Sequence, residues 1–203
     1  MSIIEVPTPI DFMRMDHCLD WESKAMARPF RLEFFEAITS QLRMLDTSEL
    51  NILELGSGPG FLALYILDRL PDVKMSLLDF SPAMHELARK RLAPYTERIN
   101  FIERDFKRDD WTAGLGTFDV IVSVQSVHEL RHKLYAETLH RKVKTLLGDR
   151  GCYLVCDHYF GEDGLQNDQL YMTRDEQRSC LAAAGFTVSD LLIKGGRALY
   201  RAA

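Results

Sequence analysis

Residues 52–61 read ILELGSGPGF, a short apolar run followed at once by a glycine-rich loop. Gly56, Gly58 and Gly60 have no side chains, so the backbone can turn sharply there and a ligand can approach the main chain closely. Apolar residues recur at helical spacing in FLALYILDRL (61–70), which predicts that a helix opens directly after the loop. The first N–H groups of a helix have no partner within it and can bind a polar ligand. The stretch therefore predicts a strand, a binding loop and a helix in direct succession.

From residue 50 onward, apolar runs alternate with helical patterns, which indicates the fold class. Strands are expected at LNILEL (50–55), VKMSLLD (73–79), INFIE (99–103), FDVIVSV (118–124), CYLVCD (152–157), FTVSDLLI (186–193) and RALYRA (197–202). Helices are expected at 61–70, at 81–94 with Ser81 as N-cap and Pro82 in first position, and at 134–148 and 174–186, both ending at a glycine. This order predicts an open, doubly wound, mostly parallel α/β sheet of seven strands. Lys194-Gly195-Gly196 is too short for a parallel crossover, so the last two strands should form an antiparallel hairpin.

Residues 1–49 carry no strand pattern and are expected to form a helical N-terminal extension or lid. Pro29 should break the helical pattern of WESKAMARPFRLEFFEAITSQLRML (21–45). After it, an apolar stripe predicts a helix packed on the sheet, formed by Phe34, Phe35, Ile38, Leu42 and Leu45. The earlier residues that could act as a lid are Phe12, Met13, Met15, Trp21 and Met26. The expected organisation is a single domain over 1–203, with 50–203 as the cofactor-binding core.

Composition and charge narrow the class of protein. Hydrophobic residues make up 46% and charged residues 27% of the chain, which is typical of a soluble globular protein. The formal net charge of -5 argues against nucleic acid as the main partner. No apolar run approaches the roughly 20 residues of a membrane span, and the N-terminus does not read as a signal peptide. None of the four cysteines stands in a CxxC pair, so we expect all of them to be reduced thiols and the protein to be cytoplasmic. These cysteines are Cys18, Cys152, Cys156 and Cys180.

Three acidic residues stand at or just after the ends of successive predicted strands. Glu54 precedes the first glycine of the loop, where a carboxylate suits a cationic amine better than a pyrophosphate. Asp79 ends the second strand and could accept hydrogen bonds from two ribose hydroxyls, whereas Asp105, after the third strand, could accept from an exocyclic amine. Phe61 is bulky where dinucleotide-binding loops prefer a small residue, which disfavours a nicotinamide cofactor. An ordinary turn and capping carboxylates are the alternative for this set.

With these residues in place, the chain resembles the class I S-adenosylmethionine-dependent methyltransferases over roughly residues 50 to 203. The resemblance is carried by ELGSGPG, LLDFSP, RDF, FDVIVSVQSVHEL and the closing AGF and GGRALYRA. It implies a Rossmann-like methyltransferase fold, S-adenosyl-L-methionine as cofactor and methyl transfer to a small-molecule acceptor by in-line displacement. The cofactor-binding residues that it implies are Glu54, Gly56, Ser57, Gly58, Gly60, Asp79, Phe80, Asp105, Phe106 and Ser123.

The acceptor and the oligomeric state are left open by the sequence. The link HYFGEDGLQNDQLYMT (158–173) is too short to hold a substrate domain, and with the acidic balance it favours a small acceptor over a macromolecule. The chain also lacks the Asp/Asn-Pro-Pro-Tyr motif of methyltransferases that act on adenine or glutamine. A nicotinamide-dependent oxidoreductase and a non-catalytic S-adenosylmethionine-binding protein are the alternative functions.

The stretch HELRH (128–132) matches the zinc signature of many metalloproteases, but its context argues against that function. The signature needs a helix that places both histidines on one face, whereas FDVIVSV leads into His128 as a strand. Arg131 would also place a cation beside the metal. We therefore expect no metal site, and His128 should lie in a loop or first turn just past the end of the fourth strand.

The family resemblance places this stretch in the wall of the acceptor cleft. His128 is then the candidate base or acceptor-positioning residue, and the alternative is a loop histidine that only shapes the pocket. Further candidates for the base are Glu129, His132 and His158, Tyr159 is expected on the cleft side, and His17 and Trp21 could close over it.

Overall fold

The computed structural model describes residues 3–45 and 49–203. Residues 1–2 and 46–48, which fall in the predicted N-terminal extension, lie outside the described residues. The seven strands follow the order β3-β2-β1-β4-β5-β7-β6 in one mixed sheet, which confirms the predicted α/β fold. The chain forms two compact units: the first unit is Pro9–Asp105, and the second unit is Phe106–Ala203 with the described residues up to Thr8.

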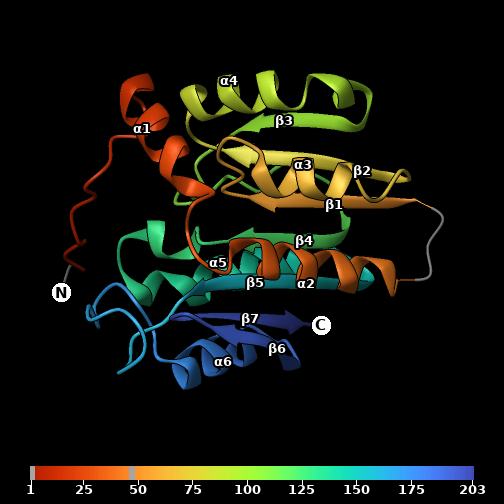
Figure 1. Ribbon diagram of the computed structural model, residues 1–203. Coiled ribbons are helices and arrows are strands. Elements are labelled where there is room, and N and C mark those ends of the chain that lie inside the picture. The colour runs from red at the N-terminus through yellow and green to blue at the C-terminus, as the bar shows by residue number, and fades with distance from the viewer. Residues whose placement is uncertain (1–2, 46–48) are drawn as a thin grey trace. The chain divides into compact units, whose positions relative to one another are not determined.

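The first unit contains a three-stranded parallel sheet (Figure 1). Its elements are α1 (Met15–Ala25), α2 (Arg31–Arg43), β1 (Leu50–Leu55), α3 (Phe61–Leu67), β2 (Val73–Asp79), α4 (Pro82–Arg91), η1 (Ala93–Arg98) and β3 (Ile99–Glu103). Both β1 and β2 are buried almost along their whole length, as expected for parallel strands covered by helices. As predicted, α4 begins with Pro82 in first position and with the Ser81 side chain accepting from the N–H of Met84.

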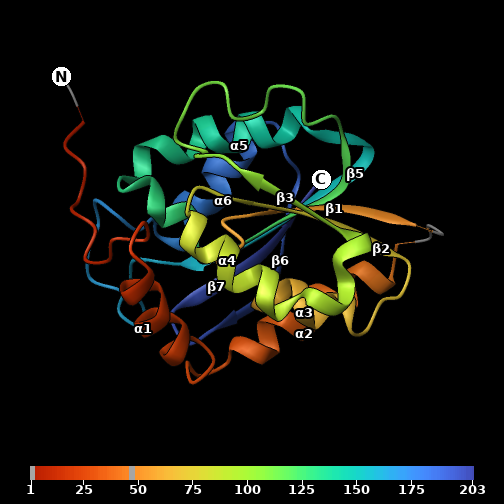
Figure 2. The same ribbon diagram turned by 90° about the horizontal axis from the view of Figure 1, so that it is seen from above.

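The helical pattern of the N-terminal segment breaks at Pro29, as predicted, and α1 and α2 form on either side of it. The apolar stripe of α2 is buried apart from Leu45, which is only partly covered and follows the end of the helix. Helix α1 lies beside α4 (Figure 2), where Phe12, Met15 and Trp21 pack against a buried cluster that includes Met84. This part of the segment therefore has a packed apolar side, while Met13 and Met26 are exposed.

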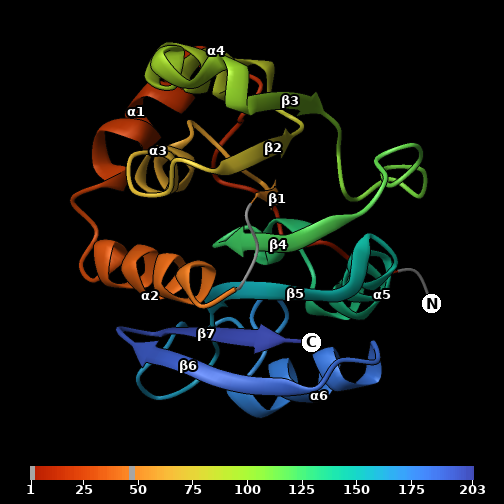
Figure 3. The same cartoon turned by 90° about the vertical axis from the view of Figure 1, so that its right-hand side faces the viewer.

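The second unit contains β4 (Phe118–Val124), η2 (Val127–Leu130), η3 (Lys133–Tyr135), α5 (Ala136–Thr145), β5 (Leu147–His158), α6 (Arg174–Ala183), β6 (Val188–Lys194) and β7 (Arg197–Ala202). Strands β4 and β5 are parallel, and β7 runs antiparallel between β5 and β6 (Figure 3). The predicted hairpin forms through Gly195 and Gly196, both at positive φ, as a tight two-residue turn requires. Gly185, at a φ of 92°, follows the end of α6 as predicted.

The predicted end of one helix is wrong. We expected the pattern from residue 134 to end at Gly148, but α5 ends at Thr145 and β5 already begins at Leu147. The reason is strand pairing: Leu147 is in register with Phe118 of β4. Pairing in the sheet requires an extended backbone at Leu147, so the helix ends before Gly148. Throughout residues 3–45 and 49–203, no helix combines the length and apolar character needed to cross a membrane.

We expect Ser81→Ala to lower the free energy of unfolding by about 1 kcal/mol, because it removes the N-cap of α4. The same hydroxyl also donates to the backbone oxygen of Phe12, so the change loosens the N-terminal segment as well. Denaturant unfolding measures the loss. Ser189→Ala, at an exposed position of β6, is the matched control and should stay within about 0.5 kcal/mol of the parent. Equal stability of the two variants would contradict the assigned cap.

Candidate functional site

The glycine loop of the first unit has the backbone conformation that its sequence predicts. Gly56, Gly58 and Gly60 have φ angles of 65°, 53° and 78°, which side chains other than glycine rarely adopt. A Cβ atom on Gly60 would also lie 2.8 Å from Cδ1 of Leu92, so this glycine allows close packing below the loop. At Gly58 an added Cβ would meet nothing within 4 Å, so the loop leaves open space on that side.

Asp79 ties this loop to the end of β2. The N–H of Gly58 donates to Oδ2 of Asp79 at 2.8 Å, and the N–H of Ser81 donates to Oδ1 at 2.9 Å. Burial raises the pKa of Asp79, and these two donors oppose the rise because they stabilise the carboxylate. The N–H of Arg104 donates to the backbone oxygen of Asp79 at 3.1 Å, so the turn that carries Asp105 lies beside this strand end.

Glu54 is a buried acid beside the loop, with only 4% of its surface exposed. Its Oε2 atom has no hydrogen-bond partner within the described chain, and the same holds for the buried hydroxyl of Ser57. Burial, and next the charge of Asp79, raise the pKa of Glu54 to about 8, against the opposing effect of Arg31. These two side chains are therefore the polar groups of the loop region that a ligand could satisfy.

The remaining predicted cofactor residues belong to different elements and to both units of the chain. Phe80 is 38% exposed, and its ring meets the ring of Phe12 edge to face at 6.4 Å. Asp105 is the last residue of the first unit and Phe106 the first of the second, both partly exposed. Ser123 is buried in β4, with its hydroxyl 2.7 Å from that of Ser126.

The HELRH stretch does not form an α-helix. His128 and Glu129 lie on the short 3-10 helix η2 just past the end of β4, and Arg131, at a φ of 66°, ends that helix. The His132 ring accepts the N–H of Leu134 at the start of η3, so the two histidines do not share a helical face. Within residues 3–45 and 49–203, no group of three or more His, Cys, Asp or Glu residues is placed to hold a metal ion.

His128 is held instead by Asp157, a residue of β5 that we did not single out from the sequence. Its Nδ1 lies 2.7 Å from Oδ1 of Asp157, and its backbone N–H donates to Oδ2 at 2.9 Å. On the other side of the ring, Nε2 lies 3.4 Å from Oε1 of Glu129. Burial by itself lowers the pKa of His128, but the two carboxylates outweigh burial and raise this pKa to about 10. His128 is therefore an imidazolium at neutral pH.

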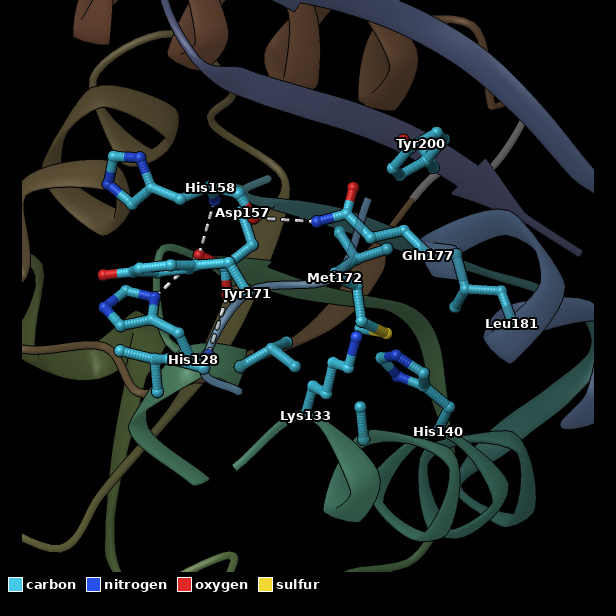
Figure 4. A pocket seen from close by; sticks show the side chains of 14 residues that line it. His128, Lys133, His140, Asp157, His158, Tyr171, Met172, Gln177, Leu181 and Tyr200 are labelled. Atoms are coloured by element: carbon cyan, nitrogen blue, oxygen red, sulfur yellow. Dashed lines mark hydrogen bonds and ion pairs between the residues drawn. The ribbon is translucent and has the colours of Figure 1, made fainter. Parts of the chain in front are cut away.

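A pocket of about 450 Å³, counting its part open to solvent, lies next to this pair (Figure 4). The rings of His158 and Tyr171 lie 5.7 and 5.6 Å from the His128 ring. Burial is the main reason why the pKa of His158 is lowered to about 4, so this histidine is neutral. The Nε2 atom of the His158 ring accepts a hydrogen bond from Nε2 of Gln125 at 2.6 Å. The remaining walls are largely apolar, so the pocket suits a small organic molecule with few polar groups.

Several earlier candidates lie elsewhere. His132 and Tyr159 do not line this pocket, because His132 caps η3 and the Tyr159 hydroxyl donates to Oδ2 of Asp163 at 2.7 Å. His17 and Trp21 belong to the first unit, where the His17 ring accepts the N–H of Asp11. Closure of these two residues over an acceptor stays a prediction.

Comparison with known proteins agrees with the resemblance seen in the sequence. Residues 52–151 match the model of a methyltransferase domain. The chain is 30% identical over 170 residues to a malonyl-[acyl-carrier protein] O-methyltransferase of Geobacter sulfurreducens, covering 74% of this chain and 61% of that relative. The chain thus spans less than two thirds of that relative's length.

Solved structures share the fold at low sequence identity. An O-methyltransferase family protein from Burkholderia thailandensis superposes with a TM-score of 0.74 at 17% identity, over 94% of this chain and 60% of that one. Human N-acetylserotonin methyltransferase, solved in complex with S-adenosylmethionine, gives a TM-score of 0.72 at 19% identity, over 97% of this chain and 59% of that one. These two likenesses establish the methyltransferase fold.

We expect His128 to stay protonated through neutral pH and to titrate near pH 10, while His140 and His158 are neutral above about pH 6, since their pKa values are lowered to about 4. Imidazole NMR shifts recorded against pH measure all three. Asp157→Asn should lower the pKa of His128, because the charge of Asp157 is the largest cause that raises it and burial then meets only the opposing effect of Glu129. Asp149→Asn, at an exposed position on the same strand, is the matched control.

The same pair makes stability depend on pH. The pKa of His128 is raised in the folded state, so its contribution is fully present below the unfolded pKa of about 6.5 and is lost as pH rises through 10. The Asp157→Asn variant should lose this dependence over that window. A parent protein in which His128 titrates near 6.5 would contradict the ion pair.

Proposed function

We propose that the chain is a class I methyltransferase that transfers a methyl group from S-adenosyl-L-methionine to a small-molecule acceptor, which the match of residues 52–151 to a methyltransferase domain supports. The observation that carries the proposal is the pair of buried acids at the ends of the parallel strands β1 and β2, beside a glycine loop in the positive-φ conformation. Such strand ends are where open α/β sheets bind their ligands.

The residues of the first unit fit the cofactor. Glu54 offers an unsatisfied buried carboxyl oxygen to the ammonium group of the methionine part, and Asp79 offers a carboxylate to the ribose hydroxyls. When bound, the cofactor supplies a methyl group made electrophilic by its sulfonium. The proposed contacts also include Gly56, Ser57, Gly58, Gly60, Phe80, Asp105, Phe106 and Ser123.

The pocket of the second unit is the proposed acceptor site, with His128 as the residue that orients the acceptor. An imidazolium with a pKa of about 10 cannot take a proton at neutral pH, which favours the positioning role over that of base. An anionic acceptor needs no base, and it would compete with Glu129, 3.4 Å from Nε2, for this cation. One relative is named for O-methylation of a malonyl group on an acyl-carrier protein, so we propose a carboxylate acceptor, free or attached to a carrier.

The organisation and location of the protein complete the proposal. We propose one methyltransferase domain over residues 1–203, with 1–49 as an extension or lid and 50–203 as the core. The described cysteines are all free thiols, which supports the proposed cytoplasmic location.

Asp79→Asn should weaken binding of S-adenosylhomocysteine by roughly 10- to 100-fold, because it replaces a charged acceptor of hydrogen bonds by a neutral amide. Isothermal calorimetry measures the affinity. Asp72→Asn keeps the same change of charge at an exposed position before β2 and should bind like the parent. Unchanged affinity in the Asp79 variant would remove this carboxylate from the cofactor site.

His128→Asn should raise the acceptor KM by roughly tenfold or more and leave the affinity for S-adenosylhomocysteine unchanged, because a charged hydrogen bond to the acceptor is lost. The acceptor for this assay is first found by incubating a metabolite extract with methyl-labelled cofactor. His132→Asn, outside the pocket, is the control. A loss of about 100-fold in kcat at constant KM would instead identify His128 as the base, and full activity would exclude it from the site.

A further inference from the structure

Glu54 occupies an unusual electrostatic position in the first unit. It lies on the parallel strand β1, one residue before the end of the strand, and it is almost fully buried. The charged groups that act on it are Asp79 from β2 and Arg31, which is itself buried, from α2. From α4, His85 approaches Asp79, with Nε2 3.1 Å from its backbone oxygen. Glu54 and Asp79 are thus two buried acids whose charges act on one another.

The hydrogen bonds decide which of these two acids is neutral. Asp79 accepts from the N–H groups of Gly58 and Ser81, and both donors stabilise its charged form. No donor within the described chain reaches Oε2 of Glu54, so a charge there would be buried without a hydrogen bond. Burial and the neighbouring Asp79 accordingly raise the pKa of Glu54 to about 8. Burial raises the pKa of Asp79 as well, but Asp79 has two backbone donors that stabilise its charge and Oε2 of Glu54 has none, so we take Glu54 as the neutral acid.

Resting on the proposed cofactor, we propose that Glu54 is a carboxylic acid in the free protein and becomes a carboxylate when the ammonium group of S-adenosylmethionine or S-adenosylhomocysteine binds beside it. The O–H bond of Glu54 breaks, its proton passes to solvent, and the ligand's ammonium keeps its three hydrogens. The new ion pair then supplies the hydrogen bonds that Oε2 lacks in the free protein. Glu54 therefore distinguishes ligands that carry the methionine ammonium from adenosyl compounds that do not.

This mechanism fixes the sign of the pH dependence. Ligand binding requires the ionised form of Glu54, which is scarce below its free-state pKa of about 8. Affinity for S-adenosylhomocysteine should therefore rise about tenfold per pH unit from pH 6 towards 8 and level off above it. 5′-Methylthioadenosine has the adenosyl part but no amino-acid group, so its affinity should change much less over this range than that of S-adenosylhomocysteine.

Calorimetry in buffers of different ionisation enthalpy tests the proposal directly. At pH 7, binding of S-adenosylhomocysteine to the parent should release about 0.9 of a proton, the fraction of Glu54 that is neutral at that pH. Glu54→Gln should release none and lose the pH dependence, yet bind 5′-methylthioadenosine like the parent, which also shows that the variant is folded. Glu49→Gln, at an exposed position just before β1, should behave like the parent with both ligands.

The outcomes separate this inference from the proposed function. Binding of S-adenosylhomocysteine without proton release, or with equal release in the Glu54→Gln variant, overturns the role of Glu54 and leaves the cofactor assignment intact. Failure of the parent to bind either adenosyl compound overturns the proposed function and this inference with it. Should the Glu54→Gln variant not fold, the contrast between the two ligands in the parent's pH dependence still decides the question.

Discussion

One arrangement recurs near the ends of the parallel strands, and both candidate sites depend on it: a buried aspartate that accepts a backbone N–H from its own segment and another from the loop after the neighbouring strand. Asp79 accepts an N–H from Ser81, just after its own strand, and another from Gly58, in the loop after the neighbouring strand β1. Asp157 does the same in the second unit, accepting from the N–H groups of His158 and His128. Each carboxylate thereby fixes a loop of the candidate site beside it, because parallel neighbours end at the same edge of a sheet.

The two aspartates differ in what their loops present. The loop at Asp79 is built of glycines at positive φ and presents main chain and open space, which suits a bulky cofactor. In the loop at Asp157, the residue whose N–H donates to the aspartate is His128, whereas in the loop at Asp79 it is Gly58. The loop at Asp157 therefore presents an imidazole. In the proposed function, the same backbone device therefore serves cofactor binding in one unit and the positioning of His128 in the other.

Much of this could be predicted from the sequence, because the signals are local. The alternation of strands and helices predicted the sheet, and the strand-like residues before His128 predicted that HELRH would not form a helical zinc motif. Asp157 could also have been predicted as a site residue, since it ends a predicted strand as Asp79 does. It was missed because no glycine loop stands beside it in the sequence. Tyr171 could not be predicted, because it comes from the irregular link 158–173, whose path depends on tertiary contacts. The early end of α5 was missed for the same kind of reason, since pairing with Phe118 overrides the helical pattern.

The protonation states of the buried acids and histidines depend on their charged and hydrogen-bonding neighbours as well as on burial. Burial disfavours charge everywhere, so it leaves Glu54, His140 and His158 neutral at neutral pH. His128, whose side chain is 15% exposed, stays charged because Asp157 is fixed by two backbone N–H groups and cannot turn away from it. Among the histidines of the pocket, the cation is thus confined to the one residue whose partner is rigid. For the proposed anionic acceptor, a cation held in place by Asp157 needs no reorganisation of its ring to align the acceptor for methyl transfer, and Glu129 is the group that the acceptor would displace.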